Sequence, residues 1–67
     1  MNWTYTSYNT YHYYDEITGY IAGCVNVHFD STCFAYYEDK KIGSYINLDK
    51  AKAAVEEAHY RKQTDIS

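Results

Sequence analysis

The sequence predicts an α+β domain in which an antiparallel sheet of three to four strands packs on one C-terminal α-helix. Tyr, Thr, Val, Ile and Phe dominate residues 1–45, and these residue types suit a pleated, half-buried surface. Residues 20–29 alternate strictly between two faces, which is typical of a strand. Residues 48–62 repeat small apolar side chains at helical spacing.

Residues 3–14 fit a first strand, and the polar stretch at residues 7–9 is a candidate break within it. Trp3 and Tyr5 share one face of this strand, because alternate side chains of a strand point the same way. Residues 15–19 predict a turn in which Gly19 takes a positive φ.

Residues 20–29, 32–37 and 42–46 predict the other strands, and residues 38–41 form a polar hairpin loop between the last two. If residues 30–31 are a two-residue turn, Val27 opposes Phe34 and Val25 opposes Tyr36 on an apolar face. The reverse face then pairs His28 with Cys33, and its side chains are small, aromatic and uncharged.

The helix follows Asn47, a residue that favours the N-cap position. Asp49 in its first turn and Arg61 and Lys62 in its last complement the helix dipole. The buried stripe is expected to consist of Leu48, Ala51, Val55 and Ala58, with Ala54 beside it. Residues 1–62 are therefore expected to form one domain, followed by a frayed tail at residues 63–67.

Charge and composition indicate the cellular compartment and the kinds of partner to expect. The net charge of −3 divides into −5 for residues 1–39, which contain no Lys or Arg, and +2 for residues 40–67. The N-terminus shows no signal-peptide pattern, and no apolar run reaches the ~20 residues that span a bilayer. These features predict a cytoplasmic protein with reduced thiols and no membrane partner. A chain of 67 residues has a small core, so self-association, as a dimer, is an expected source of stability.

The run from Phe34 to Glu56 carries a resemblance. Phe34-Ala35-Tyr36-Tyr37, a charged turn, Ile42-Gly43-Ser44-Tyr45 and the helix from Leu48 look like the second half of many short phage-encoded reading frames. The arrangement is also similar to the ethylene-response-factor type of DNA-binding domain and to some integrase arm-binding domains. The DNA-binding function does not transfer, because those domains use basic strand residues and here no Lys or Arg precedes Lys40.

Catalytic and metal sites find no support in the residue pattern. His28 and Cys33 are the sharpest candidates for a nucleophile pair, yet no third group orients them. Cys24 and His28 lie roughly 13 Å apart along a strand, and no paired ligand motif occurs, so neither a zinc site nor a Cys24–Cys33 bridge is expected. We expect a non-enzymatic protein without a cofactor.

The tyrosines and the acidic turns are the expected contact surface. Ten tyrosines exceed what so small a core can hold, and Tyr is enriched at protein interfaces. The resemblance implies a phage accessory protein that binds and inhibits or modulates a host protein in the host cytoplasm, in host takeover or anti-defence. The acidic turns offer one mechanism for such binding, by mimicking the phosphates of a nucleic acid. A nucleic-acid-binding module is the alternative. The predicted partner-binding residues are Tyr11, Tyr13, Tyr14, Tyr20, Tyr37, Asp15, Glu16, Asp30, Glu38 and Asp39.

Overall fold

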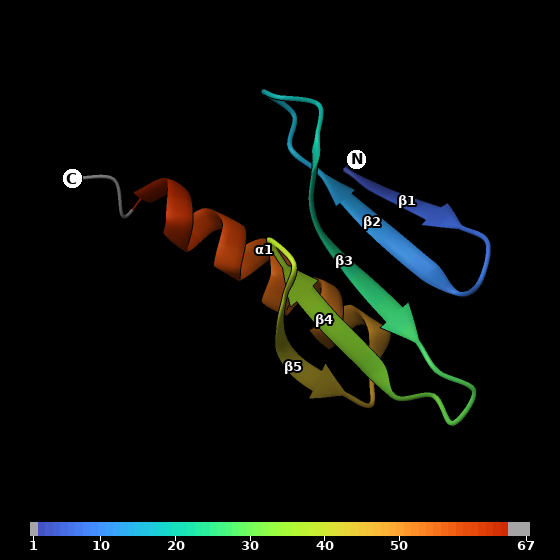
Figure 1. The fold of residues 1–67 in the computed structure, drawn as a ribbon. Helices are drawn as coiled ribbons and strands as arrows, with labels where there is room; N and C mark the ends of the chain where they lie inside the picture. Colours follow the sequence, from blue (N-terminus) through green and yellow to red (C-terminus); the bar gives the residue numbers. More distant parts are fainter. Residues whose placement is uncertain (1, 65–67) are drawn as a thin grey trace.

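The architecture is a five-stranded antiparallel sheet with one helix on one face, in a computed structural model that describes residues 2–64 (Figure 1). The strands lie in chain order: β1 (Trp3–Thr6), β2 (Thr10–Tyr14), β3 (Ile21–Val27), β4 (Cys33–Tyr37) and β5 (Lys40–Tyr45). Helix α1 (Leu48–Thr64) follows. The α+β class and the packing of the C-terminal helix on the sheet are confirmed.

The strand number is larger than the sequence predicts because residues 3–14 form a hairpin. Tyr8 and Asn9 both take positive φ, 67° and 56°, and reverse the chain so that Trp3 pairs with Tyr13 and Thr6 with Thr10. The candidate break at residues 7–9 is thus a full turn between two strands.

The predicted register of β3 with β4 is wrong by one residue. Residues 28–32 form a longer loop, in which Asp30 Oδ1 accepts a hydrogen bond from Thr32 N–H and Ser31 takes a φ of 73°. Val25 therefore pairs with Ala35, and Val27 with Cys33. A one-residue shift moves every side chain to the other face, so Phe34 and Tyr36 leave the apolar side.

Helix α1 packs over β3, β4 and β5, and its start is capped as predicted. Asn47 Oδ1 accepts hydrogen bonds from Asp49 N–H at 2.7 Å and Lys50 N–H at 3.3 Å. Residues 63–64, which the sequence assigns to the tail, continue the helix, and residues 65–67 lie outside the described part. Within residues 2–64, no helix is long and apolar enough to cross a bilayer.

The core between helix and sheet is thin. Val25 and Val55 are its largest fully buried side chains. Gly23 lets the helix approach, because a Cβ there would lie 2.7 Å from Val55 Cγ1 and from the Tyr36 carbonyl oxygen. Among residues 2–62, the buried apolar residues are Tyr13, Val25, Cys33, Ala35, Tyr37, Ala51 and Val55.

Candidate functional site

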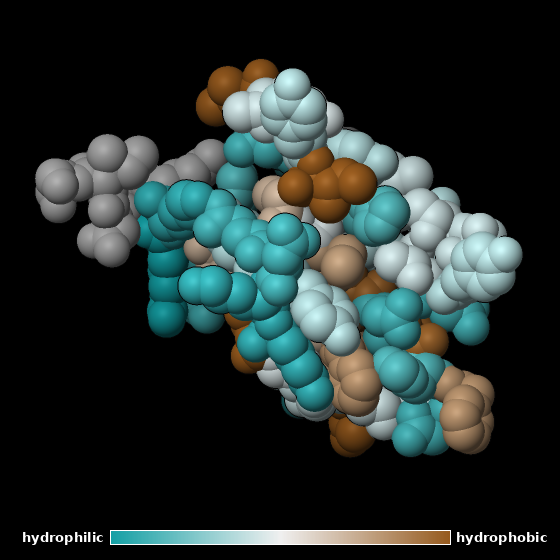
Figure 2. Space-filling view, in the orientation of Figure 1, coloured by the Kyte–Doolittle hydropathy of each residue, from teal (hydrophilic) through white to brown (hydrophobic). Residues whose placement is uncertain are grey.

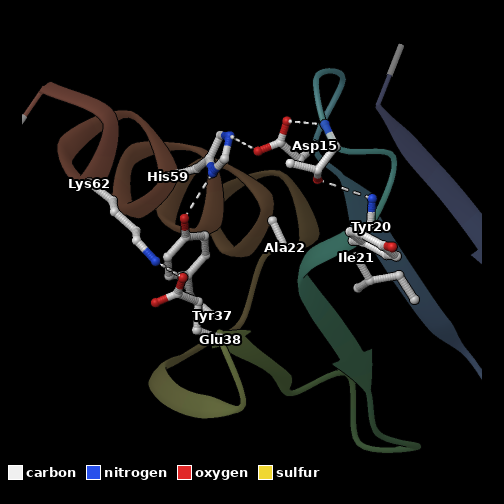
Figure 3. Close-up of a pocket in the computed structure, with 9 residues that line it drawn as sticks. Asp15, Tyr20, Ile21, Ala22, Tyr37, Glu38, His59 and Lys62 are labelled. Atoms are coloured by element: carbon white, nitrogen blue, oxygen red, sulfur yellow. Dashed lines mark hydrogen bonds and ion pairs between the residues drawn. The ribbon is translucent and has the colours of Figure 1, made fainter.

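A groove lies at the end of the molecule where the β2–β3 turn, the β4–β5 turn and the last turns of α1 meet (Figure 3). We call it the end groove, and its volume is about 360 Å³, within the range typical of ligand and side-chain pockets. It is lined by Asp15, Thr18, Tyr20, Ile21, Ala22, Tyr37, Glu38, His59 and Lys62.

The β2–β3 turn is organised by Asp15. Its Oδ1 accepts hydrogen bonds from Ile17 N–H at 2.7 Å and Thr18 N–H at 3.2 Å, and its carbonyl oxygen accepts from Gly19 N–H at 2.8 Å. Gly19 takes a φ of 77°, which confirms the predicted turn. The backbone donors at Ile17 and Thr18, with the nearby His59, lower the pKa of the Asp15 carboxyl below its ordinary value.

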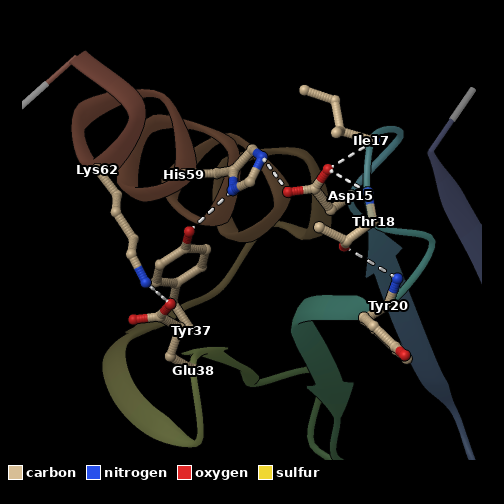
Figure 4. Close-up of polar contacts among 8 residues, drawn as sticks. All are labelled: Asp15, Ile17, Thr18, Tyr20, Tyr37, Glu38, His59 and Lys62. Atoms are coloured by element: carbon tan, nitrogen blue, oxygen red, sulfur yellow. Dashed lines mark hydrogen bonds and ion pairs between the residues drawn. The ribbon is translucent and has the colours of Figure 1, made fainter. Parts of the chain in front are cut away.

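His59 joins this turn to β4 across the floor of the groove (Figure 4). The Tyr37 hydroxyl lies 2.8 Å from His59 Nδ1, and His59 Nε2 lies 3.5 Å from Asp15 Oδ2. A neutral imidazole with its proton on Nε2 satisfies both contacts, the hydroxyl donating to Nδ1. Sequence reasoning missed His59; its position four residues after Val55, on the buried stripe, was the available signal.

The environment of Tyr37 opposes ionisation of its hydroxyl. Burial, together with the charge of Asp15 and the neighbouring Tyr13, raises the pKa of the Tyr37 hydroxyl, so the phenolate form is disfavoured. The contacts of His59 with Tyr37 and Asp15 connect α1 to β4 and to the β2–β3 turn.

The outer wall of the groove is more exposed. Lys62 Nζ forms an ion pair with Glu38 Oε2, and both side chains are about half-exposed. Glu38 and Asp39 form the β4–β5 turn, and both take positive φ, 52° and 67°, the backbone geometry that suits a two-residue hairpin turn. This turn is shorter than the predicted loop of residues 38–41, because Lys40 and Lys41 belong to β5.

Beside the groove, the β2–β3 segment exposes three large apolar side chains, which we call the turn patch. Ile17 is 86% exposed, Tyr20 77% and Ile21 50%. In Figure 2, hydrophobic groups lie exposed at this end of the molecule among paler side chains, above the more polar helix, and others lie toward the opposite end. The patch and the groove share Tyr20 and Ile21, so apolar and charged groups form one continuous surface.

Four predicted contact residues, Asp15, Tyr20, Tyr37 and Glu38, meet in the groove. Glu16 lines a second hollow on the other side of Asp15 and His59, and Asp39 adjoins Glu38 in the turn.

The other predicted contact residues lie elsewhere. Tyr14 lies on the sheet face that α1 leaves open, where its ring is 6.3 Å from the ring of His12, two residues earlier in β2. Tyr11 lies on the helix side, where Lys52 Nζ is 4.6 Å from its ring, and Asp30 is at the opposite end of the sheet.

Tyr13 and Tyr37 are the least exposed of the predicted contact residues, at 9% each. Both face the helix because they pair with Gly23 across the strands. Tyr37 satisfies its hydroxyl through His59, which is how a small core accommodates a tyrosine.

Cys24, Cys33 and His28, the residues that the sequence offers for a nucleophile pair or a metal site, lie in different surroundings. Cys33 points to the helix side and Cys24 to the open face, and both thiols are free. His28 packs on the Phe34 ring at 4.2 Å rather than facing Cys33. Burial, with the charge of Asp39, raises the pKa of the Cys24 thiol. Among residues 2–64, no group of three or more His, Cys, Asp or Glu side chains has a metal-binding arrangement.

Comparison with known proteins finds no family model, no curated protein and no solved structure that matches the chain.

Proposed function

We propose that this domain is a non-enzymatic protein-binding module whose contact surface is the turn patch with the end groove. The observation that carries the proposal is the exposure of Ile17, Tyr20 and Ile21 on one segment beside a charged groove. Interfaces concentrate their binding energy in such aromatic and aliphatic anchors surrounded by polar groups.

The charges around the patch define the kind of partner. Glu16 lines a hollow together with Ile17, and Glu38 lines the end groove together with Tyr20 and Ile21, while Lys62 is paired with Glu38. A partner that presents an apolar side chain next to Lys or Arg complements this surface. The sequence resemblance of residues 34–56 to short phage reading frames extends the proposal to a host protein that the domain inhibits or modulates.

Imitation of nucleic acid by acidic turns receives less support than a mixed apolar and acidic contact. Asp30 lies at the far end of the sheet from the other four acidic residues, in the β3–β4 loop. Asp15 is occupied by the amides of its own turn and by His59. Glu38 is paired with Lys62, so of the five predicted acidic contact residues Glu16 and Asp39 are left to present charge outward at this end.

The test is capture of a host protein by the immobilised domain. We expect one stoichiometric protein to be retained by the wild type and lost with the double variant Ile17→Ser/Tyr20→Ser. The matched control is Tyr8→Ser/Phe29→Ser, which removes side chains that are 91% and 102% exposed at the other end of the sheet. Circular dichroism verifies that all three proteins fold. Retention by the first variant and loss by the second would refute this site.

Nucleic-acid binding is the second candidate, because the open sheet face carries aromatic rings. Phe34 and Tyr36 are half-buried there, and Lys41 Nζ lies 4.0 Å from the Phe34 ring. Such rings can stack on unpaired bases, but Lys41 is the only Lys or Arg on this face of the described strands. A mobility shift that collapses with added salt and is lost on Phe34→Ala would favour this candidate over protein binding.

A further inference from the structure

The two edges of the sheet differ in how they are protected against further strand pairing. The β5 edge carries Lys40 and Lys41, and a register shift between Ala35 and Tyr36 leaves Ile42 out of the ladder. Charged side chains and bulges are the devices by which proteins prevent edge pairing. The β1 edge has neither, because its sequence Trp-Thr-Tyr-Thr is uncharged and its pairing with β2 is regular.

The hydrogen bonding of the first hairpin shows which backbone groups of β1 remain free. Tyr14 N–H donates to the Asn2 carbonyl oxygen at 2.8 Å. In an antiparallel ladder the bonded positions alternate, so Thr4 and Thr6 direct their backbone groups toward β2. Trp3 and Tyr5 therefore direct their N–H and C=O groups away from β2, along the open edge.

The side chains of β1 are complementary to those of a second, antiparallel β1 strand. Trp3 packs against Tyr13 in a tilted contact and Tyr5 against Tyr11 edge to face, with ring centroids 5.0 and 4.9 Å apart, and Tyr5 is still 55% exposed. Thr4 points to the open face and is also exposed. In an antiparallel pair of β1 strands centred on Thr4, each Trp3 opposes the Tyr5 of the other copy and Thr4 opposes Thr4.

We propose that β1 pairs with β1 of a second copy across a two-fold axis at Thr4, which joins the two sheets. The register uses all the outward backbone groups of Trp3 and Tyr5, and it extends the aromatic rows of both hairpins across the interface. The pairing is closed, since each copy has one such edge, and the Lys40–Lys41 edge opposes growth beyond a dimer. The end groove is not involved, so this proposal is independent of the proposed function.

Sedimentation and amide exchange test the dimer and its register. We expect reversible dimerisation between about 10 µM and about 1 mM, the range in which weak complexes form. Protection of the Trp3 and Tyr5 amides should rise with concentration, whereas the Thr4 and Thr6 amides should be protected at every concentration. A wild type that sediments as a monomer at about 1 mM would overturn the proposal.

Charged side chains introduced at the two-fold axis test the register of the dimer. Thr4→Lys and Thr4→Glu each place two like charges directly opposite, so each variant alone should dimerise at least about tenfold more weakly than the wild type. Mixing the two should restore a heterodimer, seen as the mixed mass by native mass spectrometry, which also shows that both variants fold. Ser44→Lys, at an open-face site on β5 that is also exposed, should leave dimerisation unchanged. A dimer that Thr4→Lys does not weaken would overturn the proposed register.

Discussion

At the residue scale, His59 connects three parts of the chain that are far apart in sequence. Its ring lies 2.8 Å from the Tyr37 hydroxyl and 3.5 Å from Asp15, and it packs on Tyr13 at a centroid distance of 5.4 Å. Tyr37→Phe removes the hydroxyl donor and keeps the ring, so the free energy of unfolding should fall by about 1 kcal/mol. Urea denaturation measures this, with Tyr8→Phe, a 91% exposed tyrosine, as the unaffected control. Equal stability of the two variants would contradict a role for the Tyr37–His59 bond.

Asp15 makes the same region sensitive to acid. The amides of Ile17 and Thr18, then His59, hold its pKa below the ordinary value of 3.8, so the folded state binds this proton more weakly than the unfolded chain. The stabilisation is complete above pH 3.8 and is lost as the pH falls from there through the lower folded pKa. Asp15→Asn keeps an oxygen acceptor for the turn but removes the titration.

The stability of Asp15→Asn, measured by thermal unfolding from neutral pH down to acid, should therefore decline less steeply than that of the wild type. The stability of Asp30→Asn should also decline less steeply with acid, because the Thr32 amide and hydroxyl lower the pKa of Asp30. The double variant should show both effects. If Asp15→Asn lost stability in acid as steeply as the wild type, Asp15 would not be the source of the acid sensitivity.

At the element scale, sequence patterns predicted the helix and its cap because these depend on neighbouring residues. Asn47 caps the helix as expected, and Ala51 and Val55 are buried on the predicted stripe. The pairing of β3 with β4 was not predictable in the same way, because it depends on the conformation of one loop. Ser31 adopts a positive φ of 73°, which is uncommon for serine, and this lengthens the loop and shifts the whole strand.

The approach of α1 to β3 gives the element-scale prediction. Gly23→Ala would place a Cβ 2.7 Å from the Tyr36 carbonyl oxygen and from Val55 Cγ1, so the helix or the strand must move. We expect a loss of about 1–3 kcal/mol in unfolding free energy. Gly43→Ala is the matched control, because its closest contact is the Tyr45 hydroxyl at 2.7 Å, the far end of a side chain that can rotate away. Equal losses at the two glycines would contradict close packing at Gly23.

At the scale of the whole molecule, the end groove depends on tertiary structure. Its lining comes from the β2–β3 turn, the β4–β5 turn and the last turns of α1. The sequence identified Asp15, Tyr20 and Glu38 individually, by residue type. It could not show that they converge, nor that Asp30 lies at the other end, because the order of strands decides which turns share an end of the sheet. The burial of Tyr13 and Tyr37 was not predicted either. Which side chains of a strand face the helix depends on how the strands pair, and that pairing is seen only in the folded structure.

At the same scale, side-chain contacts attach the first hairpin, β1 and β2, to helix α1. Trp3 Nε1 donates to Glu56 Oε2 at 2.7 Å, and Lys52 Nζ lies 5.5 Å from the Trp3 ring and 4.6 Å from the Tyr11 ring. These contacts tie β1 and β2 to a helix that packs mainly over β3, β4 and β5. Because the chain has one tryptophan, tryptophan fluorescence reports on the surroundings of Trp3, and measurement at low protein concentration keeps the chain monomeric.

Glu56→Ala should shift the Trp3 emission to longer wavelength and lower the unfolding free energy by about 1 kcal/mol or less, since the bond is exposed. The fluorescence transition in urea should then precede the transition seen by circular dichroism, because the hairpin would detach before the rest of the domain unfolds. Glu57→Ala is the control: its carboxylate lies 3.6 Å from Arg61 on the solvent side, and removing it should leave the emission unchanged. Coincident transitions and an unshifted emission in Glu56→Ala would mean that the hairpin is held by the sheet pairing alone.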